Sequence, residues 1–171
     1  DPQNISVGNP GLKPAFTNDF RLFYNTYKQS HSQALMTFAN FSTTRNAIGN
    51  SVTYDAITGA RTIRPVNVNG NWDADAGLMY NTSIDSAGVW NLHTFTRANF
   101  NRYVSYLQLN RTSNLEKNIT KSLTLGERLA ASYRTSWLEL ELDGSVDYTN
   151  TKNNLQSMSN LRTWQFAYGG T

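Results

Sequence analysis

Residues 66–80 read VNVNGNWDADAGLMY and alternate between apolar and polar side chains. The apolar side chains occupy the even positions: Val66, Val68, Trp72, Ala74, Ala76, Leu78 and Tyr80. Asparagine and aspartate fill most of the odd positions between them. A period of two places the two kinds of side chain on opposite faces of a β-strand. Because the run exceeds the about 9–11 residues that a tilted strand needs to cross a bilayer, it predicts a transmembrane β-strand.

The same alternation recurs along the chain. Its apolar positions fall in the segments 20–24, 90–100, 123–133, 138–148 and 164–168. Glu127 is a charged exception on an apolar position. Residues 34–41 are apolar on both parities, so their facing stays open. The pattern predicts an all-β fold of about seven long antiparallel strands, part of a larger transmembrane meander barrel.

Composition agrees with a barrel wall. Mean hydropathy is −0.53 although only 16% of the residues are charged, so uncharged polar residues supply most of the polarity. Such residues suit a water-filled lumen and long loops. The chain has no cysteine, which excludes disulfides, thiolate zinc sites and cysteine nucleophiles. Its net charge of +3 comes from scattered basic residues, so we expect no nucleic-acid partner.

The expected connections between strands alternate in length. Short ones fall near 30–33, 84–88 and 135–136, and long polar ones fall near 49–62, 110–118 and 150–160. Bacterial outer-membrane barrels have short periplasmic turns and long extracellular loops. Aromatic residues flank the short turns, and others follow about ten residues along the strands, as expected of membrane girdles. These predicted girdle residues are Tyr24, Tyr80, Trp90, Tyr133, Trp137, Phe100 and Tyr148.

One ion pair follows from the spacing around the third short turn. If Thr135 and Ser136 form a two-residue hairpin loop, Arg134 lies opposite Trp137. Counting back along both strands then places Arg128 opposite Asp143 on the polar face, where the two charges are expected to pair.

No arrangement of residues predicts catalysis or metal binding. Glu139, Glu141 and Asp143 have the spacing of paired carboxylates, but no aromatic sugar platform shares their face. Asp73 and Asp75 begin like a calcium loop, yet Ile84 stands where the loop needs a glutamate. We therefore expect no catalytic residue, no metal site and no cofactor, and a protein that is not an enzyme.

The segment Gly8-Asn9-Pro10-Gly11-Leu12-Lys13-Pro14 resembles the Gly-Asn-Pro-x-Leu-Lys-Pro-Glu segment of TonB-dependent outer-membrane receptors. The chain differs from it at Ala15, where the family usually has glutamate. The segments 55–59 and 65–67 also resemble the loop and strand entry of that family's barrel. The resemblance implies a barrel of about 22 strands around a plug, driven by an inner-membrane energy-coupling protein.

On this interpretation residues 1–171 are a single barrel segment, an internal section of the C-terminal half of a receptor without its plug. The expected location is the bacterial outer membrane, and the expected function is a part in importing a bulky nutrient such as a metal chelate, vitamin or glycan. The expected partners are outer-membrane lipid, the rest of the barrel and plug, and the energy-coupling protein through parts absent from this chain. Candidate ligand contacts in the long loops are Tyr54, Asp55, Arg61 and Arg64.

A soluble ligand-binding β-barrel or β-sandwich is the alternative. In that fold the apolar positions of the strands form an internal core, so they are expected to pack against one another and to be hidden from solvent.

Overall fold

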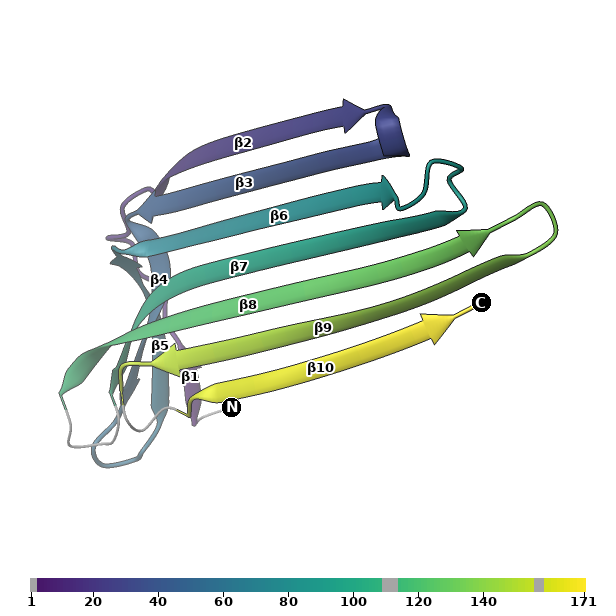
Figure 1. The fold of residues 1–171 in the computed structure, drawn as a ribbon. Helices are drawn as coiled ribbons and strands as arrows, with labels where there is room; N and C mark the ends of the chain where they lie inside the picture. The colour runs from purple at the N-terminus through teal and green to yellow at the C-terminus, as the bar shows by residue number, and fades with distance from the viewer. Residues whose placement is uncertain (1–2, 109–113, 156–158) are drawn as a thin grey trace.

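The chain forms one open, twisted β-sheet (Figure 1). The computed structural model describes residues 3–108, 114–155 and 159–171. The elements in these ranges are β1 (Asn4–Ser6), β2 (Phe16–Lys28), the 3₁₀ turn η1 (Ser30–Ser32), β3 (Gln33–Arg45), β4 (Ala47–Tyr54), β5 (Arg61–Val68), β6 (Asn71–Ser83), β7 (Trp90–Gln108), β8 (Leu115–Arg134), β9 (Glu139–Asn153) and β10 (Leu161–Gly170). Within them no helix is long and apolar enough to span a membrane.

Seven long strands make a wall in the order β2-β3-β6-β7-β8-β9-β10. Each is antiparallel to its neighbours. Among the described residues β2 pairs only with β3 and β10 only with β9, so the sheet has two open edges. The prediction of an all-β fold with about seven long antiparallel strands is confirmed. The short strands β1 and β4 were not predicted, and only residues 66–68 of β5 were predicted to be a strand.

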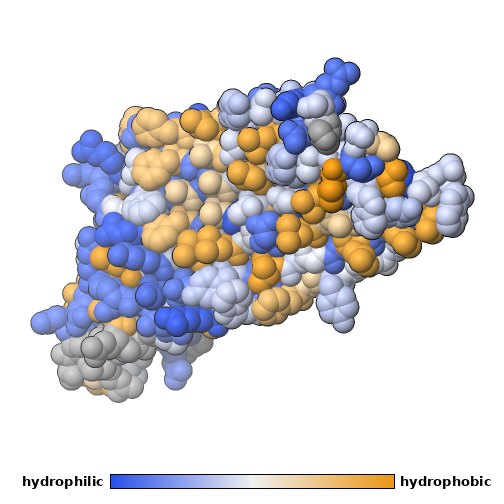
Figure 2. Space-filling view, in the orientation of Figure 1, coloured by the Kyte–Doolittle hydropathy of each residue, from blue (hydrophilic) through white to orange (hydrophobic). Residues whose placement is uncertain are grey.

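The wall has an apolar face and a polar face. We call the face that carries Phe20, Leu78, Leu142 and Phe166 the outer face, and the opposite one the inner face. Large side chains of the outer face are solvent-exposed: 62% for Phe20, 70% for Leu142 and 74% for Phe166. Figure 2 shows hydrophobic side chains spread across the wall. A core that hides these positions, which the soluble alternative requires, is absent from the described residues.

The facing of residues 34–41, left open by the sequence, follows from the pairing of β3. Leu35, Thr37, Ala39 and Phe41 lie on the outer face, because they pair with Tyr80, Leu78, Ala76 and Ala74. Phe38 therefore lies on the inner face, opposite Gly77. A Cβ atom at Gly77 would be 2.4 Å from the Phe38 ring. Residues 34–41 are therefore apolar on both parities in part because Phe38, on the inner face, packs over Gly77.

Glu127 lies on the outer face, opposite Thr96 and Val146. Its Oε2 accepts a hydrogen bond of 2.5 Å from the Thr96 hydroxyl. The sequence therefore placed Glu127 on the correct face, and Thr96 of the neighbouring strand β7 is its polar partner.

The prediction of one continuous strand over residues 66–80 is wrong. The chain breaks between β5 and β6 at Asn69 and Gly70, where Gly70 adopts φ +102°. Asparagine side chains brace the break: Asn69 Oδ1 accepts from the Asn46 amide at 2.8 Å, and Asn71 Oδ1 accepts from the Val104 amide at 2.9 Å. A bend that preserves the alternation leaves no trace in the hydropathy pattern.

The predicted long loop near 49–62 is also different. Most of it is β-structure, because β4 and β5 form a hairpin there. β4 runs parallel to the end of β7, where Ser51 pairs with Tyr106. Ala47, Val68 and Val104 form a small buried cluster at this junction. Strand β4 forms because β6 leaves the end of β7 unpaired. The local sequence of β4 does not reveal this distant partner.

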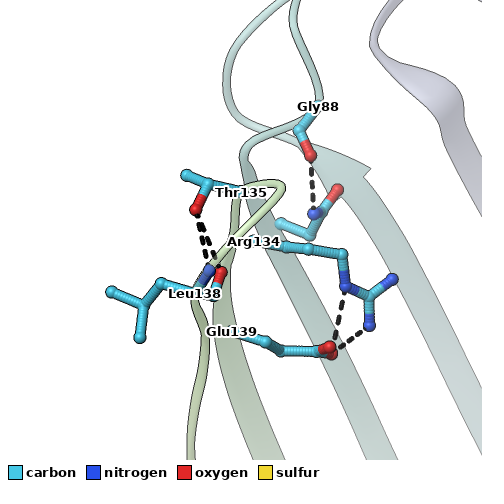
Figure 3. Close-up of polar contacts among 6 residues, drawn as sticks. Gly88, Arg134, Thr135, Leu138 and Glu139 are labelled. Atoms are coloured by element: carbon cyan, nitrogen blue, oxygen red, sulfur yellow. Dashed lines mark hydrogen bonds and ion pairs between the residues drawn. The ribbon is translucent and has the colours of Figure 1, made fainter.

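The third short turn is longer than predicted (Figure 3). Arg134 lies opposite Glu139 rather than Trp137, so β9 begins one residue after Leu138. The Thr135 amide donates to the Leu138 carbonyl at 2.8 Å, and the Thr135 hydroxyl also bonds Leu138. These bonds close a four-residue turn in place of the two-residue loop. The register shifts by two residues, which keeps every side chain on its expected face.

Asp85 organises the turn between β6 and β7. Its carboxylate accepts hydrogen bonds from the amides of Trp90 at 2.7 Å and Val89 at 3.1 Å. These bonds, that from Trp90 above all, lower the pKa of Asp85 below its ordinary value. The two amide hydrogen bonds hold the turn and favour the ionised form of the Asp85 carboxyl group.

This turn is expected to loosen in acid. A lowered pKa in the folded state means that the stabilisation is present above the pKa of the unfolded chain and is lost as pH falls through the folded one. The Trp90 amide resonance, followed by NMR in micelles, should titrate below the ordinary pKa of an aspartate. It should not titrate in Asp85→Asn. A titration that persists in the variant contradicts this role.

Leu78 and Met79 provide a matched test of the two faces. They lie opposite Thr96 and Phe95, midway between Trp90 and Phe100, and both are 40% exposed. Leu78→Arg should lower the free energy of unfolding in lipid vesicles by about 2–4 kcal/mol, because it puts a charge into lipid at mid-depth. Met79→Arg should cost clearly less, because it faces water. Equal losses in a urea titration would show that the faces are misassigned.

Candidate functional site

The inner face carries ion pairs along β7, β8 and β9. The first joins Arg97 on β7 to Asp147 on β9, with 2.7 Å between Nη2 and Oδ1. The arginine crosses β8 at Gly126, which lies opposite both residues. A Cβ atom at Gly126 would lie 2.4 Å from Asp147 Oδ1 and 2.5 Å from Arg97 Nε. The glycine therefore leaves the room in which the two charges meet, and a larger residue would push both side chains aside. Sequence analysis missed this pair, although the parity of Arg97 and Asp147 already placed both on the polar face.

Two further pairs continue towards the short turns. Arg128 Nη2 lies 3.1 Å from Asp143 Oδ1. This contact is diagonal, because Arg128 is opposite Ser145 and not opposite Asp143 as the two-residue loop required. Arg134 pairs with Glu139 beside the turn (Figure 3). In the part of the chain that the structure describes, all three ion pairs lie on the inner face. Their side chains are partly exposed, so each contributes at most about 1 kcal/mol.

On the inner face of β2, β3 and β6, aspartates outnumber basic residues. Asp75 accepts a hydrogen bond of 2.8 Å from Asn40. Asp19, Arg21 and Asp73 lie around the same shallow hollow of about 320 Å³. Among the described residues no group of three histidine or acidic side chains is placed to hold a metal ion. The inner face is therefore a hydrated polar wall that mixes both signs of charge.

The four predicted loop contacts come together on the β4–β5 hairpin. Tyr54 ends β4 directly opposite Arg61, the first residue of β5. Asp55 Oδ1 accepts from the amides of Ile57 at 3.0 Å and Thr58 at 2.6 Å, so it fixes the turn. Arg64 Nη2 reaches Asn9 Oδ1 at 3.3 Å. The side chains of Asp55 and Arg64 thus have partners within the fold, while Tyr54 and Arg61 form one cross-strand pair.

The segment with the Gly-Asn-Pro motif docks on the same hairpin. Asn9 Nδ2 donates to the Pro65 carbonyl at 2.9 Å. Lys13 exchanges two backbone hydrogen bonds with the Asn67 side chain, at 2.7 and 2.9 Å. The motif therefore joins the start of the chain to the β5 strand, where a pairing between β1 and β5 extends the contact.

The predicted girdle aromatics lie towards the two ends of the wall. Near the short turns Trp90 stands 4.7 Å from Tyr133, measured between ring centroids. Towards the other end Phe100 stacks on Trp72 at 4.7 Å, and Tyr148 lies 4.6 Å from Trp164. The remaining predicted girdle residues, Tyr24, Tyr80 and Trp137, lie at or near the short turns. Sequence analysis missed the ladder that joins Phe20, Phe41 and Trp72 to Phe100, because it depends on strand register.

Residues 1–169 match the model of the outer membrane protein beta-barrel family. The chain belongs to this family. Searches of curated proteins and of solved structures found no match.

Membership of the outer membrane protein beta-barrel family assigns the chain to the bacterial outer membrane, as predicted. Membership of the family also indicates which medium each face of the wall contacts, lipid or water. The exposed hydrophobic face contacts lipid, and the face with the ion pairs contacts the aqueous lumen. The soluble alternative has no support from the family or from the exposed outer face.

Any side chain at position 126 should lower the stability of the protein. Gly126→Ala forces Arg97 and Asp147 apart and should lower the free energy of unfolding by about 1–3 kcal/mol. Gly144→Ala on β9 is the matched control, since the nearest contact of its Cβ atom would be an ordinary 3.8 Å. It should be neutral or slightly stabilising. Equal effects of the two substitutions in urea titrations would contradict the requirement for a glycine at 126.

Proposed function

We propose that this chain is a wall section of a larger outer-membrane barrel that imports a bulky nutrient in the manner of a TonB-dependent receptor. The observation that carries the proposal is the open sheet of seven long strands. In lipid every backbone N–H and C=O group needs a partner, so β2 and β10 require further strands beside them. Residues 1–171 act in this proposal as one barrel segment, without a plug.

The extracellular side follows from the loops. Short turns lie at the end of the wall near η1, and the β4–β5 hairpin lies at the opposite end. Because outer-membrane barrels have short periplasmic turns and longer extracellular loops, this asymmetry supports an extracellular position for the hairpin. The docked Gly8–Pro14 segment, which resembles the corresponding receptor segment, supports the same orientation.

The role proposed for this section is scaffolding and ligand contact rather than catalysis. The polar inner wall surrounds the transport path, and the hairpin offers Tyr54 and Arg61 to an incoming ligand. Energy coupling belongs to a plug and an inner-membrane partner that this chain does not include. The proposed substrates are a metal chelate, a vitamin or a glycan.

Uptake by the full-length protein in intact cells tests the proposal. Radiolabelled ferric chelate, cobalamin and oligosaccharide should be compared in cells with and without the protein. Import of one class should be saturable and should stop when an uncoupler collapses the proton gradient of the inner membrane. Uptake that rises linearly with concentration and ignores the uncoupler indicates an open pore and contradicts the proposal.

The hairpin pair should contribute to ligand binding. Tyr54→Ala and Arg61→Ala are each expected to weaken binding of the imported ligand about tenfold, because each removes a contact group of more than 1 kcal/mol. Lys28→Ala at the opposite rim is the control and should leave the dissociation constant unchanged. If all three variants bind equally in titration calorimetry, the hairpin is not the contact surface.

A further inference from the structure

Three cations form one row on the outer face of the wall. Arg102 on β7 lies opposite Lys121 on β8, which in turn lies opposite Lys152 on β9. They share the outer face with Phe100 and Leu123, which stand two residues away along β7 and β8. Like charges directly opposite each other in a sheet repel. This cationic row therefore needs a counter-charge.

The protein does not supply that counter-charge within its described residues. The three ion pairs found there all lie on the inner face, and none includes a member of the cationic row. Glu127, the acid of β8 on the same face, is six residues from Lys121, roughly 20 Å along the strand. Arg102 is held in place by a bond of 2.6 Å from Nη1 to the Gly70 carbonyl, while Lys121 and Lys152 are exposed.

An apolar groove begins two residues from Arg102 and Lys121, at Phe100 and Leu123, and runs from there across β6 and β3 to β2. It has a volume of about 570 Å³, and Phe100 and Leu123 line it. Alanines from three neighbouring strands supply small side chains along it: Ala39, Ala74, Ala76 and Ala98. Phe20, Leu22 and Phe41 complete its apolar lining. The outer face thus has an apolar groove with one end close to the cationic row.

The row lies at the height of lipid headgroups. Phe100 and Trp72 stack at the end of the apolar band, where aromatic girdles mark the membrane interface. Arg102 is two residues beyond Phe100, roughly 7 Å further along the strand. This is the end of the wall that carries the β4–β5 hairpin and, in Figure 2, hydrophilic side chains gather towards it. Basic clusters at this level attract anionic lipid headgroups.

We propose that the cationic row and the alanine groove together bind a phosphate-bearing acylated lipid of the outer leaflet. The phosphate bonds to Lys121, Lys152 and the guanidinium of Arg102, and an acyl chain lies in the groove. The lipid phosphate supplies the counter-charge that the cationic row lacks. This site goes beyond the proposed transport function, but it rests on the orientation proposed there, with the β4–β5 hairpin on the extracellular side.

Lipid titration of the full-length protein, purified from outer membranes in detergent, tests the site. Diphosphorylated lipid A is the probe, and native mass spectrometry counts the bound lipid. Lys121→Gln combined with Lys152→Gln should weaken binding about 30-fold. The matched control, Lys28→Gln combined with Arg134→Gln, removes the same charge at the opposite end of the wall and should bind as the unchanged protein does. Circular dichroism verifies that both variants are folded.

Three further arms distinguish the source of the phosphate and the role of the groove. Dephosphorylated lipid A should bind the unchanged protein as weakly as lipid A binds the double variant. Millimolar inorganic phosphate should not displace lipid A. Ala98→Leu, which fills the groove and keeps every cation, should also weaken lipid A binding. The proposal is overturned if the double variant and its control bind alike, if dephosphorylated lipid A binds as tightly as lipid A, if free phosphate displaces the lipid, or if Ala98→Leu has no effect.

Discussion

Backbone N–H and C=O groups inside a bilayer have no water to bond, so a strand there is stable only between two neighbours. That constraint accounts for the long antiparallel ladders from β2 to β10, in which each strand pairs over most of its length. It also accounts for the small buried core, which among the described residues centres on Ala47, Val68 and Val104. Stability comes from the ladder and from lipid around the outer face, not from a packed interior.

The ladder also fixes what each face can do. Because register sets which side chains are neighbours, it brings Arg97 across Gly126 to Asp147 on the inner face. The same register lines up Arg102, Lys121 and Lys152 on the outer face, where no carboxylate of the described residues lies beside them. Three arginines of the inner face are thus paired with acids of the protein, whereas the counter-charge of the cationic row is proposed to come from the membrane.

The sequence was sufficient for the fold class and for the facing of most strands, because a period of two is a local property that lipid and water both select. It was insufficient where structure depends on partners far along the chain. The bend at Gly70 preserves the alternation and so escapes notice. Strand β4 exists because β7 extends beyond β6, and the turn after Arg134 shifts register by two residues without changing any face. For the same reason the contact between Arg97 and Asp147 could not be predicted.

Labelling of single cysteines tests the central claim, that the two faces of one sheet meet lipid and water. Three single-cysteine variants of the full-length protein are compared in intact outer membranes: Leu78→Cys, Leu140→Cys and Asn99→Cys. Each is treated separately with a lipid-soluble and with a water-soluble thiol reagent. The account predicts that positions 78 and 140 react only with the lipid-soluble reagent and that position 99 reacts only with the water-soluble one. Positions 78 and 140 that react with neither reagent would indicate a packed core and contradict the account.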